Sequence, residues 1–69
     1  MSDTLGEALP KEMARVRDKV MPLYVEIGPP GQLALMLMRA SLDAAARAMA
    51  EGDVIAMIRA HEDLKGFTA

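Results

Sequence analysis

The side chains in this sequence that could carry chemistry are few, and they are not arranged around one reaction centre. The single histidine, His61, is followed by Glu62 and Asp63. Successive residues of a helix point about 100° apart, so these three side chains cannot bind one metal ion within the chain. Ser2 and Ser41 have no evident base to activate a hydroxyl, and the chain contains no cysteine. We therefore expect no catalytic residue, no metal site and no bound cofactor.

His61 falls among the apolar positions of its predicted helix, and two roles remain open for it. Imidazole changes charge near neutral pH, which makes His61 a candidate pH-sensitive position or subunit contact. The alternative is a structural histidine that is hydrogen-bonded to a backbone carbonyl or to Tyr24. Either role places His61 at the edge of the packed helices.

Composition and charge argue against several classes of partner. The chain has 8 Lys and Arg against 10 Asp and Glu, whereas nucleic-acid-binding proteins usually carry a basic excess. Tyr24 and Phe67 are the only aromatic residues, so nucleic-acid bases would have no platform on which to stack. The most apolar stretch, residues 33–50, contains three charged side chains and is a poor membrane span. We expect neither nucleic acid nor a membrane as a partner.

The expected location is the cytoplasm. Residues 1–7 lack the basic and apolar regions of a secretory signal peptide. The absence of cysteine fits a reducing compartment.

Helix-forming residues dominate the sequence, while aromatic and β-branched residues are few, which indicates an all-α fold. The run Gly-Pro-Pro-Gly at residues 28–31 is a structural hinge between helices. Gly52 and Asp53 suit a helix end followed by a helix cap, so the last two helices should form an αα-hairpin. The predicted organisation is a flexible tail over residues 1–8, a single helical domain over residues 9–66 and a C-terminal tail over 67–69. The helices of the domain should span about 9–27, 30–51 and 54–65.

The first helix should carry one apolar seam. Its spacing of four and three residues is typical of a heptad pattern. Pro22 lies within this helix but projects away from the seam, so we expect a kinked helix rather than two short ones. The predicted seam consists of Leu9, Met13, Val16, Val20, Leu23 and Ile27. The third helix should likewise bury Val54, Met57, Ile58, His61 and Leu64.

The central helix is apolar on two sides, and one of those sides has no partner within the chain. Charged residues recur every four positions on this helix and form a narrow ladder: Arg39, Asp43, Arg47 and Glu51. The ladder is either a solvated edge of the helix or a stripe that binds a partner. One apolar face holds Leu35, Met38, Leu42, Ala45 and Met49. The second face, our candidate interface, holds Leu33, Met36, Leu37, Ala40 and Ala44.

On folding, a chain of 69 residues buries only about 60% of the surface that the unfolded chain exposes, so its stability is marginal. Because it contains no cysteine, no disulfide can add to that stability. Because 52% of its residues are apolar, self-association is the expected compensation. The predicted architecture is therefore a small three-helix bundle, a kinked helix packed on an αα-hairpin, completed by homodimerisation through the second face of the central helix.

Three functions fit this architecture. The first is a non-catalytic interaction, assembly or regulatory module that acts as a homo-oligomer with a further protein partner. The second is a small carrier of apolar ligands or lipids, with a cavity between helices that methionine side chains can adapt. The third is a helix-turn-helix-like DNA-binding protein, disfavoured because Glu62 and Asp63 share its reading helix with Arg59 and Lys65. The candidate cavity residues are Met13, Met36, Met38, Met49 and Met57.

Overall fold

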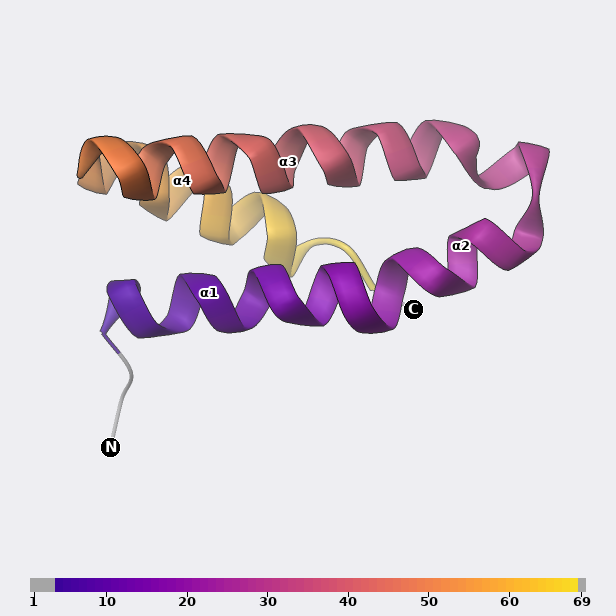
Figure 1. Ribbon diagram of the computed structural model, residues 1–69, viewed down its shortest axis with the longest axis horizontal. Coiled ribbons are helices and arrows are strands. Elements are labelled where there is room, and N and C mark those ends of the chain that lie inside the picture. The colour runs from indigo at the N-terminus through magenta and orange to yellow at the C-terminus, as the bar shows by residue number, and fades with distance from the viewer. Residues whose placement is uncertain (1–3, 69) are drawn as a thin grey trace.

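The structure is a computed structural model that describes residues 4–68, and these residues form helices without a strand. Three helical arms pack compactly, as the all-α prediction expects (Figure 1). The first arm joins two α-helices through a π-helical turn, and α3 and α4 form the hairpin. The elements are α1 (Leu5–Arg15), the π turn (Val16–Val20), α2 (Met21–Ile27), a 3₁₀ turn (Pro29–Gly31), α3 (Gln32–Glu51) and α4 (Val54–Lys65).

The first arm begins earlier than the sequence indicates. Its helix starts at Leu5, not near Leu9, because the Thr4 carbonyl accepts from the amides of Glu7 and Ala8 at 3.0 and 2.8 Å. Pro10 consequently lies inside α1 instead of in its first turn. The predicted tail over residues 1–8 is thus helical from residue 5 onward, and residues 1–3 lie outside the described part.

The arm continues through Pro22 by widening its backbone into the π turn. Proline has no amide hydrogen, and its ring crowds the carbonyl four residues earlier. Here the amide of Met21 donates to the carbonyl of Val16, five residues back, just before Pro22 opens α2. The chain therefore accommodates Pro22 within one continuous helical arm, and α2 turns toward the start of α3 (Figure 1).

The π turn also changes which residues of the arm face inward. Leu9, Val16 and Val20 are buried and Met13 is partly buried, which confirms the first part of the predicted seam. One extra residue in a helical turn rotates all following side chains by about 100°. Tyr24 therefore packs against the core, while Leu23 is 44% exposed and Ile27 is 55% exposed. The predicted seam is wrong beyond Val20 for this reason.

The core lies where α1, α3 and α4 meet. From α3 it takes Leu35, Met38 and Ala45, as predicted, with Leu42 partly buried. Ala48 on α3 and Ala60 on α4 are also buried. Alanine permits close approach of neighbouring helices at these positions.

The α3–α4 connection follows the predicted turn. Gly52 adopts a left-handed conformation with φ of 67°, which glycine reaches without steric penalty. The Asp53 carboxylate then accepts a 3.1 Å hydrogen bond from the Ala56 amide and caps α4. Two residues thus reverse the chain and bring α4 back along α3.

The residues after α4 dock on the first arm. Phe67 is partly buried against the core, and the Tyr24 hydroxyl donates to the Thr68 carbonyl at 3.2 Å. Phe67 is therefore packed and the exposed Thr68 is held by a hydrogen bond, in contrast to the predicted C-terminal tail. The last residue of that tail lies outside the described part. None of the described helices is both long and apolar enough to cross a membrane.

Candidate interaction surface

The second face of α3 is uncovered. All five residues predicted to form it are exposed, and the three large ones are exposed by 67% (Leu33), 62% (Met36) and 52% (Leu37). Ala40 and Ala44 continue the face toward the C-terminal half of the helix. The sequence prediction that this face finds no partner within its own chain is confirmed.

The opposite side of α3 explains why this face stays open. Leu35, Met38, Ala45 and Ala48 point into the bundle, where α3 contacts α4 and both parts of the first arm. A helix of about 3.6 residues per turn cannot turn both apolar faces toward one three-helix core. The packing that buries the first face therefore leaves the second toward solvent.

The charged ladder of α3 is a solvated edge in this monomer. Arg39, Asp43, Arg47 and Glu51 are all exposed, and no salt bridge connects them within residues 4–68. Exposed pairs of this kind contribute little to stability, so these charges remain available to a partner beside the apolar face.

Two further groups of exposed apolar side chains were not foreseen. Leu23, Val25 and Ile27 are exposed on α2 because of the register change at the π turn. Val54 and Ile58, predicted to be inward, are 58% and 50% exposed. That prediction is wrong because α4 packs against both α3 and α1 through Ala60 and Leu64, which turns its first residues outward.

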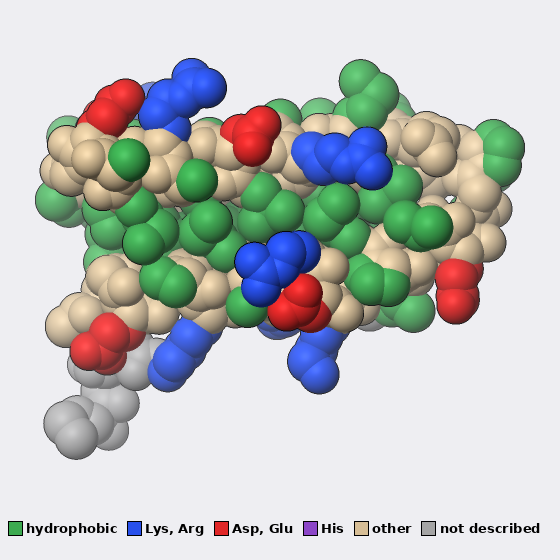
Figure 2. Space-filling view, viewed as in Figure 1, with side chains coloured by type: hydrophobic (Ala, Val, Ile, Leu, Met, Phe, Trp, Pro, Cys, Tyr) green, Lys and Arg blue, Asp and Glu red, His purple; other side chains and the backbone are tan. Residues whose placement is uncertain are grey.

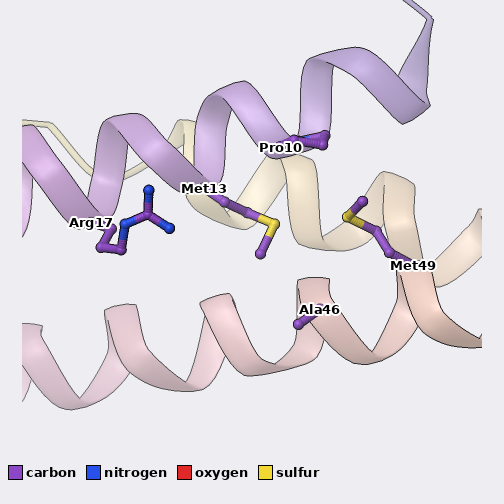
Figure 3. A pocket seen from close by; sticks show the side chains of 5 residues that line it. All are labelled: Pro10, Met13, Arg17, Ala46 and Met49. Atoms are coloured by element: carbon purple, nitrogen blue, oxygen red, sulfur yellow. The ribbon is translucent and has the colours of Figure 1, made fainter.

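An apolar pocket lies between the first arm and the C-terminal half of α3. Apolar side chains fill the band between these helices on the side facing the viewer (Figure 2). The pocket has a volume of about 340 Å³ and is shallow and widely open to solvent. Met13 and Met49 point toward each other across it (Figure 3). Its lining consists of Pro10, Met13, Arg17, Ala46 and Met49.

The single charged lining residue of this pocket is already paired. Arg17 Nε donates to Asp18 Oδ1 at 2.9 Å, and Nη2 donates to Oδ2 at 3.2 Å. The hydrogen bond from Arg17 lowers the pKa of Asp18 below its ordinary value, and the same bond raises the pKa of Arg17. The only charged side chain among the five lining residues is therefore neutralised by a neighbour.

The five methionines that the sequence offers as lining for an adaptable site do not lie together. Met38 is buried in the core, Met57 packs against it, and Met36 is exposed on α3. Only Met13 and Met49 line the pocket. Helical spacing alone could not show this pairing, because the two residues come from different arms of the bundle.

His61 is partly buried on α4, as expected for a residue at the edge of the packed helices. One of its alternative partners, the Tyr24 hydroxyl, donates to the Thr68 carbonyl at 3.2 Å and is not hydrogen-bonded to His61. Among the described residues, no group of three or more His, Cys, Asp and Glu side chains is arranged to hold a metal ion. The pH-sensitive role of His61 stays a prediction.

No family model matches this chain, and neither a curated protein nor a solved structure matches it.

Proposed function

We propose that this protein is a small non-catalytic interaction module that acts as a homodimer through the second face of α3. The observation that carries the proposal is the exposure of Leu33, Met36 and Leu37 on one continuous side of the longest helix. Exposed apolar side chains that gather on one element mark interaction sites more often than scattered ones do. The candidate interface is completed by Ala40 and Ala44, which let a second helix approach closely.

The magnitudes favour a concentration-dependent dimer. Two copies would together cover six large side chains, each about half to two-thirds exposed. At about 1 to 2 kcal/mol for each side chain, the gross gain is roughly 6 to 12 kcal/mol. Association itself costs about 4 to 15 kcal/mol, so the net affinity is modest. Because these two ranges overlap, we expect monomer and dimer to coexist in a proportion that depends on protein concentration.

The test is sedimentation velocity over a range of concentrations, with Leu37→Glu as the variant. A carboxylate at this position would be buried without a partner in the dimer, which abolishes association but leaves the monomer fold intact. Ile55→Glu is the matched control, because Ile55 is 68% exposed on α4 and lies outside the face. A wild-type chain that stays monomeric at all concentrations with full helicity contradicts the proposal, as does equal dissociation by both variants.

A second candidate function, binding of a small uncharged apolar ligand, is favoured by the pocket between Met13 and Met49. Its volume of about 340 Å³ falls at the lower end of the range of small-molecule sites. Thioether side chains can repack around ligands of different shape. The measurement is titration with an uncharged naphthalene fluorophore, which should bind the wild type and lose affinity in Ala46→Phe, where the new ring fills the pocket.

Ala50→Phe is the control for that titration, because Ala50 is exposed on the same helix but does not line the pocket. Fluorophore binding that is equal in both variants would assign it to another surface and contradict the ligand site. Weaker binding in Ala46→Phe alone would support it.

A further inference from the structure

We propose that Met36 is a modification site at which hydrogen peroxide converts the thioether to a sulfoxide, and that this makes the open face of α3 polar while the bundle stays folded. The proposal goes beyond the interaction module, because it requires no partner on that face. It follows from the opposite environments of two methionines that lie close together on one helix.

Met36 and Met38 differ strongly in their access to solvent. Met36 is 62% exposed, whereas Met38 is 1% exposed and belongs to the core. Two residues of separation on a helix turn the side chains about 200° apart, so one points outward when the other points inward. Among the methionines of residues 4–68, Met36 is the most exposed. Because the sulfur lies near the end of the side chain, a small oxidant in solution reaches it at Met36 and not at Met38.

The reaction is a two-electron oxidation of the Met36 sulfur. A sulfur lone pair attacks one oxygen of hydrogen peroxide, so that an S–O bond forms and the O–O bond breaks. The leaving hydroxide takes the proton from the transferred oxygen and departs as water. Sulfur loses the two electrons that the peroxide gains, and the product is a polar sulfoxide that methionine sulfoxide reductases can return to the thioether.

A sulfoxide at Met36 changes the surface and leaves the core intact. Leu33 and Leu37 are its neighbours on the face, three residues before it and one after it, and both are more than half exposed. The new S=O group therefore lies in water, where it is hydrated without the cost of burying a polar group. The same group at Met38 would be buried among apolar side chains, and that cost protects Met38 as long as the bundle is closed.

A time course with hydrogen peroxide tests the site, with proteolysis and tandem mass spectrometry to assign each sulfoxide to its residue. The chain is used at a dilution where it sediments as a monomer, so the result does not depend on the proposed homodimer. Met36 should react about tenfold faster than Met38 or more, because Met38 reacts only when the bundle opens. In urea that unfolds the chain, the two rates should become similar. After Met36 has reacted, circular dichroism should be unchanged and elution from a hydrophobic-interaction column should be earlier.

Two variants at the same position are the controls. Met36→Leu keeps the face apolar and should lose both the fast reaction and the shift in elution. Met36→Gln carries a polar amide in place of the thioether and should elute early without peroxide. Equal rates at Met36 and Met38 in the folded chain would overturn the proposal, as would loss of helicity when Met36 reacts or an equal elution shift in Met36→Leu. Each of these results leaves the homodimer to its own test by sedimentation.

Discussion

Arg15 joins the first helix to the end of the last one, through hydrogen bonds from its Nη2 to the carbonyl oxygens of Leu64 at 3.0 Å and Phe67 at 2.9 Å. Glu12, one turn earlier on α1, holds the guanidinium with contacts of 3.0 to 3.2 Å. The carbonyls at the end of a helix have no amide donor within that helix. Arg15 therefore caps α4 from another arm of the bundle.

Arg15→Met should lower the free energy of unfolding by about 1 to 2 kcal/mol, because it removes charged hydrogen bonds to two carbonyls in a partly buried site. The measurement is urea unfolding followed by circular dichroism, at one fixed protein concentration because association contributes to apparent stability. Arg17→Met is the control. Its bond to Asp18 is exposed on the surface, so a change below about 0.5 kcal/mol is expected. An equal loss of unfolding free energy in both variants would contradict the capping of α4 by Arg15.

Gly31→Ala should destabilise the turn between α2 and α3 by about 1 to 3 kcal/mol. Gly31 is buried, and a methyl group there would collide with the backbone of Tyr24, including its carbonyl oxygen. Its φ of −85° is accessible to alanine, so the effect is steric alone. Gly6→Ala is the matched control, since space is open there and alanine favours the helix. A thermal melt should show Gly31→Ala below and Gly6→Ala at or above the wild type.

Leu64→Ala should cost about 2 to 5 kcal/mol, because Leu64 is completely buried at the centre of the contact between α4 and the first arm. Ile55→Ala, on the same helix, removes an exposed side chain and should change stability by no more than about 0.5 kcal/mol. Guanidinium unfolding of the two variants side by side makes the comparison. A small effect of Leu64→Ala would contradict the assigned packing of α4.

Asp53→Ala should cost about 0.5 to 2 kcal/mol, since it removes the side-chain acceptor for the Ala56 amide at the start of α4. Asp53→Asn keeps an acceptor oxygen and should retain most of the stability. Amide hydrogen exchange provides a local measurement: the first turn of α4 should lose protection in the alanine variant and keep it in the asparagine variant. Loss in both variants would assign the stabilisation to the negative charge instead of the hydrogen bond.

Several features were predictable because they depend on local chemistry. Gly52 and Asp53 end one helix and cap the next through their own backbone and side-chain properties, which do not depend on distant contacts. The open face of α3 was also predictable, because a helix with two apolar sides can turn only one of them toward a small core. The exposure of this face is for that reason a surface feature that the sequence predicted correctly, and its role as an interface stays a prediction.

The orientation of the other helices depended on contacts between arms. The π turn before Pro22 adds one residue to a helical turn and so rotates the side chains of α2 by about 100°. Tyr24 then packs against the core in place of Leu23. On α4 the small residue Ala60 is buried in the core, whereas the larger Val54 and Ile58 are exposed to solvent. Hydropathy favours the larger side chains for burial, and it carries no information about which helix surfaces approach most closely.

The sequence by itself determined the all-α class, the three helical arms, the hairpin turn and the exposed apolar face of α3. Helix ends and periodicity are local properties, so they can be worked out residue by residue. Only the tertiary structure decided the register of α2, the inward side of α4, the capping of α4 by Arg15 and the pocket between Met13 and Met49. The π turn that sets the register of α2 is closed by a hydrogen bond over only five residues, but hydropathy does not reveal it. The other three features join residues far apart in the chain, whose meeting is set by the packing of the whole bundle.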